Sequence, residues 1–229
     1  MTGPDPAASV PRLVLATANQ HKLIELTRIL AAGQVAVEPC GLADFPGAPD
    51  VRETGATFAE NALLKARAIA AFTGLPAVAD DSGLCVDALN GMPGVFSARW
   101  SGRHGDDDGN LRLVLSQLAD VPEGRRGAQF ACSAALVLPA GRAHVCEEAM
   151  HGWIIREPRG ANGFGYDPIF VPDRAELAQA GLTAAGLTVA GLTAAGLTTA
   201  ELDPEAKDRI SHRGKALRAL APVIGAWCL

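Results

Sequence analysis

The residues best suited to chemistry are two adjacent carboxylates, Asp80 and Asp81, at the end of an apolar run that begins at Ala77. Such a run predicts a buried strand, and carboxylates at a strand end are suited to a hard cation such as Mg2+. The hydroxyl of Ser82 and the flexible backbone of Gly83 follow, so we expect a tight bend there. The alternative is a pair of turn-forming aspartates.

Adjacent strand residues point to opposite faces of a sheet, so only one of the two carboxylates can face a ligand squarely. The other then braces the turn or supports the site from behind. Glu53, in a loop rich in Pro and Gly before Gly55, is a further candidate metal ligand.

Three basic residues could contact phosphate. Lys22 closes the segment Thr17–Lys22, between a predicted strand and a predicted helix, where free N–H groups favour an anion; a simply capped helix is the alternative. Lys65 lies four residues after Asn61 on one helix face and could equally be a solvated lysine. Arg99 offers a bidentate fork for phosphate or a structural salt bridge.

An aromatic side chain stands between two glycines in Gly163-Phe164-Gly165-Tyr166-Asp167. Phe164 on such a loop could stack a base, a contact worth about 1–3 kcal/mol. The alternative is that Phe164, and even more so Tyr166, is an anchor in the core.

Lys207, His212 and Arg213 form the last candidate group. Lysine and arginine only donate hydrogen bonds, so they suit the 6-keto oxygen of a purine and cannot pair with a 6-amino group. His212 can donate or accept. The alternative is surface charge around a helix N-terminus.

The elements that must position these groups alternate in the first half of the chain and form a strand pair in the second. Apolar periodicity and capping signals predict strands over 12–17, 35–37, 77–81, 128–138 and 143–155, and helices over 19–30, 57–72, 106–119 and from 203 and 211. This pattern predicts an α/β domain with a mixed sheet and an antiparallel lobe, and a ligand would lie in the cleft between the lobes.

Composition excludes several classes of protein. The 229 residues carry a net charge of -5, which argues against a nonspecific nucleic-acid binder. Five cysteines without a C-x-x-C motif predict reduced thiols and a cytoplasmic protein. The uncharged stretch 177–200 is too rich in Ala, Thr and Gly for a membrane span. We expect residues 1–10 to be a disordered leader and 11–229 one domain of two lobes.

A Gly-Leu-Thr repeat occupies about residues 180–199 with a period of five. This period matches neither a helix nor a strand, so no single face becomes apolar. We interpret the repeat as an expanded surface loop inserted into the domain.

Six blocks along the chain resemble the inosine/xanthosine triphosphate pyrophosphatase family, which removes non-canonical purine nucleoside triphosphates. They occur in family order and cover nearly the whole chain after residue 10. The blocks are T-A-N-x-x-K at 17–22, T-F-x-E-N-A-x-x-K-A at 57–66, A-D-D-S-G-L at 79–84, G-M-P-G-V-x-S-A-R at 91–99, G-F-G-Y-D-P-I-F at 163–170 and K-x-x-I-S-H-R at 207–213. This chain has Ala18 and His21 where many members have glycine.

The resemblance implies Mg2+-dependent hydrolysis between the α- and β-phosphates, giving a nucleoside monophosphate and pyrophosphate, and a homodimer. It also implies the fold of an elongated mixed-sheet α/β domain with two lobes flanking a central substrate cleft. It implies that Asp81 is the general base and a metal ligand. From the residues themselves we expect Glu53 to be a second metal ligand, and Lys65 and Arg99 to contact the phosphates. The implied substrate contacts are Thr17, Ala18, Asn19, Gln20, His21, Lys22, Ser82, Phe164, Gly165, Tyr166, Asp167, Lys207, His212 and Arg213.

Two other functions remain open at this point. The chain could be a catalytically idle regulator that binds nucleotides, or a pyrophosphatase for other modified nucleoside triphosphates. Release of pyrophosphate separates the first from an enzyme, and a panel of substrates separates the second. We expect a small-molecule partner and neither a nucleic acid nor a membrane.

Overall fold

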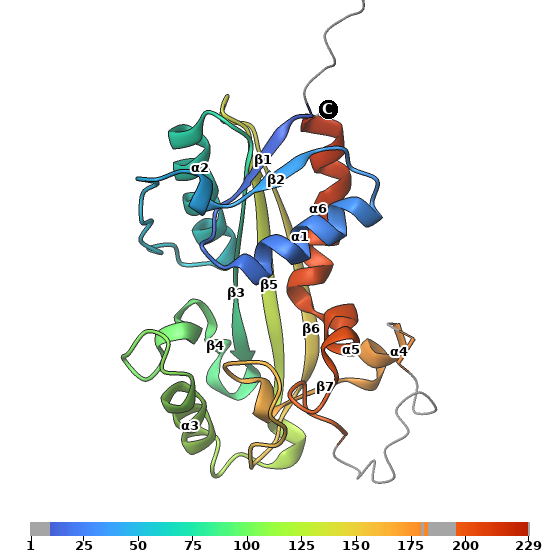
Figure 1. Ribbon diagram of the computed structural model, residues 1–229. Helices are drawn as coiled ribbons and strands as arrows, with labels where there is room; N and C mark the ends of the chain where they lie inside the picture. The colour runs from blue at the N-terminus through green and yellow to red at the C-terminus, as the bar shows by residue number, and fades with distance from the viewer. Residues whose placement is uncertain (1–9, 180, 183–195, 229) are drawn as a thin grey trace, which may run out of the picture.

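A seven-stranded mixed sheet runs the length of the molecule and joins its two lobes (Figure 1). The computed structural model describes residues 10–179, 181–182 and 196–228. Residues 1–9 of the predicted leader and residues 180 and 183–195 of the predicted repeat lie outside these described residues. The strands are β1 (Arg12–Leu15), β2 (Glu38–Cys40), β3 (Ala77–Val86), β4 (Met92–Pro93), β5 (Gly127–Val137), β6 (Ala143–Ile154) and β7 (Phe170–Pro172).

The sheet order is β2-β1-β3-β5-β6-β7, with β4 paired to β3 beside this path. β1 pairs in parallel with β2 and β3, and the other pairs are antiparallel. The long strands β3, β5 and β6 pair over most of their length and extend through both lobes. The predicted mixed-sheet α/β fold is therefore confirmed.

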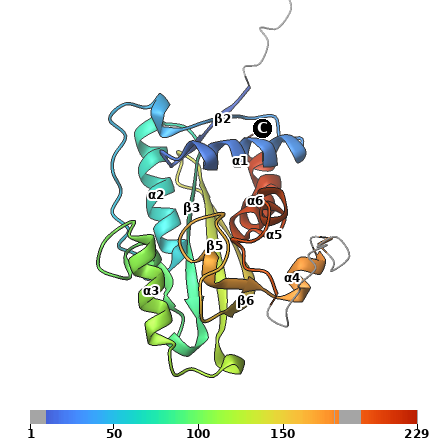
Figure 2. The same ribbon diagram turned by 60° about the horizontal axis from the view of Figure 1, so that its bottom comes forward.

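Helices cover both faces of the sheet. They are α1 (Gln20–Ala32), α2 (Phe58–Thr73), α3 (Asp107–Gln117), α4 (Arg174–Gln179), α5 (Pro204–Ile210) and α6 (His212–Cys228). In the upper lobe of Figure 1, α1 and α6 pack on the face that carries Val78 and Leu136, and α2 packs on the face that carries Ala79 and Ala135. Figure 2 shows the strands between α2 and α6.

The helix starts follow the predicted caps. The side chain of Asn19 accepts from the backbone N–H of His21 at the start of α1, and that of Thr57 accepts from Glu60 N at the start of α2. Asp203 caps α5 through Ala206 N. These caps fix where α1, α2 and α5 begin, and with that the positions of their first-turn residues.

One edge of β3 is free in the middle of the sheet. Among the described residues, β1 pairs with β3 only at Ala77 and Val78, and β4 pairs with it only at Cys85 and Val86. The stretch 79–84 therefore has β5 on one side and no strand on the other. An unpaired edge exposes backbone N–H and C=O groups to a ligand.

Three expectations from the sequence are wrong. Asp80 and Asp81 do not end a strand, because β3 continues to Val86 against β5. Gly83 does not make a bend: it lies within the strand, and a Cβ there would come within 2.3 Å of the Oγ of Ser97. The strand predicted over 35–37 begins three residues later, as β2.

Among the described residues, no helix combines the length and apolarity needed to cross a bilayer. The five cysteines are free thiols, and Cys40 and Cys132 are buried.

Candidate active site

Asp81 belongs to a cluster of polar side chains on the α2 face of the sheet. Its carboxylate accepts from Asn61 Nδ2 at 3.0 Å and from Lys65 Nζ at 3.3 Å. Lys65 Nζ also donates to Glu53 Oε1 at 2.7 Å, and Arg99 Nη1 lies 3.6 Å from Glu53 Oε2. The structure thus brings the two predicted metal ligands together around one ammonium group.

The helical spacing of Asn61 and Lys65 explains this cluster, because residues four apart share a helix face. Asn61 is fully buried, and its Oδ1 accepts from Gly55 N in the loop that carries Glu53. Asn61 therefore joins that loop to Asp81.

The two carboxylates of the cluster differ electrostatically. Burial raises the pKa of Asp81, and the nearby negative charge of Glu53 raises it further. The positive charge of Lys65 opposes this rise without cancelling it. Burial also opposes ionisation of Glu53, but Lys65 and Arg99 outweigh it and hold its pKa below the usual value. The pKa values of the two carboxylates are thus shifted in opposite directions, and the upward shift makes Asp81 a better proton acceptor than an ordinary aspartate.

Asp80 points to the opposite face and belongs to a separate network. Its Oδ2 accepts from Lys22 Nζ at 2.7 Å, and its side chain is only 3% exposed. Burial alone would raise the pKa of Asp80, but Lys22 and Arg213 hold it below the usual value. Asp80 is thus the ion-pair partner of Lys22, a contact that the sequence did not predict.

Glu25 is a functional candidate that the sequence analysis missed. Both Nε and Nη2 of Arg213 donate to Glu25 Oε2, which ties α6 to α1. The sequence did offer one indication of its role. Glu25 is an acid on the apolar stripe of α1, three residues after Lys22 and next to the buried Leu26.

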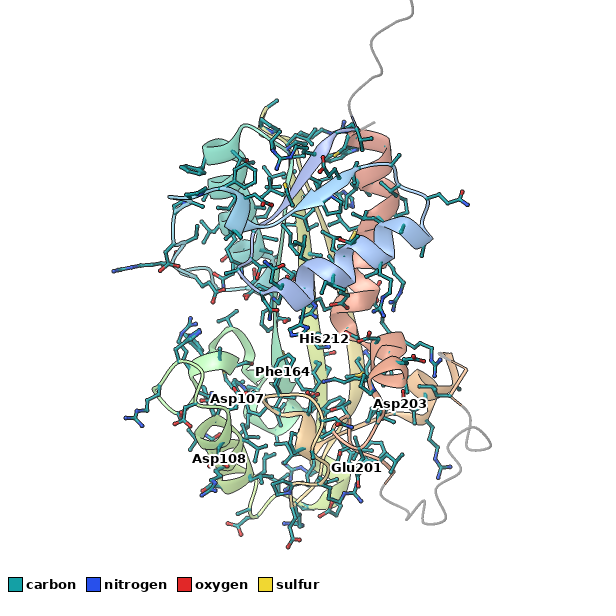
Figure 3. All side chains as sticks on the ribbon, viewed as in Figure 1. Asp107, Asp108, Phe164, Glu201, Asp203 and His212 are labelled. Carbon is teal, nitrogen blue, oxygen red and sulfur yellow. The ribbon has the colours of Figure 1, made fainter. Side chains whose placement is uncertain are left out.

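His212 lies beside Arg213 where the two lobes meet (Figure 3). Its ring stacks on Phe130 with 5.1 Å between centroids. Burial and the charge of Arg213 lower the pKa of His212 to about 3, so the ring is neutral at pH 7. Its Nδ1 is buried and has no hydrogen-bond partner among the described residues. Such an atom suits the polar edge of a ligand.

The predicted base-stacking loop divides into exposed and buried parts. Phe164 is 71% exposed, with Lys207 Nζ 5.2 Å from its ring centroid. Asp167 is buried and accepts from Lys207, from Phe164 N and from Thr199 Oγ1. The hydroxyl of Tyr166 donates to Ser97 O, so Tyr166 is a buried anchor, as its core alternative predicts.

The segment 17–22 forms the start of α1. Thr17 Oγ1 accepts from Asn19 N, and the side chain of Asn19 caps the helix. Ala18, Gln20 and His21 are exposed. The side chains of Thr17 and Asn19 are therefore engaged with the backbone, and the first-turn N–H groups and Lys22 are the parts suited to an anion.

The sheet separates the predicted residues into two groups. Asp81, Glu53, Lys65 and Arg99 belong to the α2 face, whereas Asp80 and Ser82 share the opposite face, toward Lys22, His212 and Arg213. The free edge of β3 over 79–82, before Leu84 bonds to Ser97, is where one ligand can reach both faces.

A pocket of about 550 Å³ lies away from this site, at the far end of β5 and β6. Its lining includes Asp87, Gln129, His151 and Trp153, and none of the residues predicted to bind substrate.

No group of three His, Cys, Asp or Glu side chains within the described ranges is arranged as a metal site. Glu53 and Asp81 supply only carboxylate oxygens. This donor set fits Mg2+, which typically binds one or two carboxylates together with substrate phosphates and water.

Comparisons with known proteins agree with one another. The model of the Ham1 family matches residues 13–223. A Streptomyces avermitilis protein named dITP/XTP pyrophosphatase is 54% identical over 213 residues, covering 93% of this chain and 96% of its own. A Nocardia farcinica protein of the same name is 52% identical, covering 95% of this chain and 97% of its own.

Two solved structures resemble this fold. A dITP/XTP pyrophosphatase from Mycobacterium abscessus is 52% identical, with a TM-score of 0.71 and coverage of 92% of this chain and 99% of that one. A HAM1 protein from Coxiella burnetii is 40% identical, with a TM-score of 0.79 and coverage of 95% and 100%.

Proposed function

The chain belongs to the Ham1 family, and from this membership we propose that it hydrolyses non-canonical purine nucleoside triphosphates, dITP/ITP and XTP/dXTP. The products are the nucleoside monophosphate and pyrophosphate. The observation that carries the proposal is the free edge of β3, with a carboxylate cluster on one face and donors suited to a purine on the other.

The charge balance of the site supports a metal-bound substrate. Its ion pairs join five cations (Lys22, Lys65, Arg99, Lys207 and Arg213) to five carboxylates (Glu25, Glu53, Asp80, Asp81 and Asp167). These pairs are close to neutral by formal charge, so they cannot alone offset the several negative charges of a triphosphate. A divalent cation that arrives with the substrate offsets two of these charges.

We propose that this cation is Mg2+ and that Asp81 and Glu53 hold it. When bound, Mg2+ neutralises phosphate charge and orients the leaving pyrophosphate. Asp81 orients or deprotonates the attacking water, consistent with its raised pKa. Lys65, now held between the two carboxylates, together with Arg99 and Lys22, stabilises the negative charge that develops on the phosphates.

The base lies on the other face of the sheet in this proposal. Phe164 stacks it, and Lys207 and Arg213 donate to its 6-keto oxygen. Both cations keep further donors after their pairing with Asp167 and Glu25. A 6-amino group would leave these donors unpaired, so ATP and dATP are poor substrates. Thr17–Lys22 and Ser82 line the path between base and phosphates.

One assay tests the function. Pyrophosphate and orthophosphate are measured separately from dITP, XTP, dGTP and dATP, with Mg2+ and with a chelator. We expect pyrophosphate from dITP and XTP, dependence on Mg2+, and little turnover of dATP. Binding without pyrophosphate release would favour the idle regulator. Turnover of other modified triphosphates in preference to dITP and XTP would favour a pyrophosphatase for those nucleotides.

We also propose that the enzyme is a homodimer in the cytoplasm and that residues 11–229 act as a single domain. Sedimentation equilibrium of the purified protein tests the oligomeric state directly.

A further inference from the structure

The exposed ring of Phe164 is positioned by its backbone. Because the side chain is 71% exposed, few core contacts fix its orientation. Left-handed glycines flank it, with φ of 81° at Gly163 and 59° at Gly165. A glycine-flanked residue can adopt many orientations unless its backbone is tethered.

Several hydrogen bonds tether this loop, including one from Asp167 N to Phe164 O at 3.2 Å. Phe164 N donates to Asp167 Oδ2 at 2.8 Å, within the loop itself. Gly165 N donates to Asp107 Oδ2 at 2.9 Å, and the hydroxyl of Tyr166 donates to Ser97 O at 2.8 Å. Asp107 is therefore the carboxylate from outside the loop that acts on the residue next to Phe164.

Asp107 is well suited to hold the loop in place. It lies in the first turn of α3, where the helix dipole favours a carboxylate. The helix is itself fixed, because Leu111 and Val114 pack in the core of the lower lobe. A hydrogen bond from a backbone N–H to an ionised carboxylate is also stronger than one between neutral groups.

We propose that Asp107 is a positioning residue that fixes Phe164 as the platform for the purine base. This inference rests on the proposed function, in which Phe164 stacks the base. Asp107 does not touch the substrate in this role and acts only through the backbone of Gly165. Figure 3 shows Asp107 and Phe164 in the same lobe, with Asp108 as the neighbouring acid on α3.

The test compares Asp107→Ala with Asp107→Asn and with the control Asp108→Ala. Asp108 is also a first-turn acid of α3, but its carboxylate pairs with Arg112 and lies 72% exposed. Both alanine variants therefore lose a carboxylate from the same turn, and only Asp107→Ala loses the contact to the loop. Asparagine keeps an oxygen that can accept from Gly165 N.

We expect Asp107→Ala to raise KM for dITP about tenfold, a part of what one stacked base is worth, with kcat within about twofold. The inhibition constant of inorganic triphosphate, which has no base, stays unchanged. Amide exchange at Gly165 becomes faster. Asp107→Asn restores most of the KM and of the amide protection, and Asp108→Ala behaves as the wild type.

An unchanged KM in Asp107→Ala, or an equal loss for dITP and inorganic triphosphate, overturns the role of Asp107 while the proposed function stands. A wild-type protein that releases no pyrophosphate from dITP or XTP overturns the proposed function and the base platform with it. Gly165 exchange then still reports whether Asp107 holds the loop.

Discussion

Asp80 and Asp81 are neighbours in β3 but belong to separate ion-pair networks on opposite faces of the sheet. Asp80 pairs with Lys22 at 2.7 Å, and Asp81 contacts Asn61 and Lys65. The alternation of a strand produces this division. The two carboxylates therefore have different tasks. Substitution of Asp81 should lower activity and not stability, whereas substitution of Asp80 should lower stability.

Asp81→Asn should abolish most activity and leave the fold intact. The amide cannot take a proton from water and is a weak ligand for Mg2+, so we expect kcat to fall by about 10²–10⁴. The melting temperature should not fall, because the substitution removes a carboxylate whose burial opposes its charge. A kcat close to that of the wild type would exclude Asp81 as the catalytic base.

Asp80→Asn should instead destabilise the protein. Its ion pair with Lys22 is mostly buried, and removing one partner leaves the other charge unpaired. We expect a loss of about 3 kcal/mol in the free energy of unfolding, the lower end for a buried pair, because Lys22 is 25% exposed. Urea denaturation measures this loss. Equal stabilities of Asp80→Asn and Asp81→Asn would contradict the division of tasks.

The separation of the two carboxylates followed from alternation along a strand, but the length of β3 could not be predicted in the same way. Charged residues after an apolar run are typical of a strand end, whereas here the strand continues because β5 pairs with it as far as Val86. Similarly, β2 was not predicted at its true position because it contains Pro39, and proline is unusual within a strand. As an edge strand, β2 tolerates a residue without an N–H.

Contacts between residues far apart in the chain were the other feature that the sequence could not predict. Helical spacing placed Asn61 and Lys65 on one face, and both contact Asp81. Nothing local could pair Glu25 with Arg213, because 188 positions separate them along the chain. The contact exists only once α6 packs beside α1.

Ser82 should contribute to substrate binding through its backbone. Leu84 N and O both bond to the Oγ of Ser97 on the side of β3 away from β5, and the N–H of Ser82, two residues earlier, points to the same side. Alanine keeps this backbone N–H, so we expect Ser82→Ala to change kcat/KM by less than about threefold. Loss of a side-chain hydrogen bond to a charged phosphate would instead lower kcat/KM about tenfold or more. A larger loss would assign the contact to the hydroxyl.

Arg213→Ala should weaken recognition of the 6-keto base. We expect KM for ITP to rise far more than the residual reaction with ATP changes, because ATP offers no 6-keto acceptor. Arg28→Ala is the matched control, since its pair with Asp208 is exposed and joins the same helix α1 to α5. If Arg213→Ala affects ITP and ATP equally, Arg213 does not contact the base.

His212 should make stability depend on pH on the acid side. Its pKa of about 3 lies well below the ordinary value because of burial and Arg213, with Lys207 and Lys22 adding to this and Asp80 opposing it. Between about pH 6.5 and pH 3 the unfolded state binds a proton at His212 that the folded state does not, so stability falls as pH falls.

The slope attributable to His212 reaches about 1.4 kcal/mol per pH unit in that window and vanishes above it. His212→Gln removes the titrating group and keeps a polar side chain of similar reach, so its unfolding free energy should fall less steeply between pH 6.5 and 4.5. Urea denaturation of both proteins at several pH values measures the difference. Parallel curves would mean that His212 takes up its proton over the same pH range in the folded and unfolded states, which would contradict its lowered pKa.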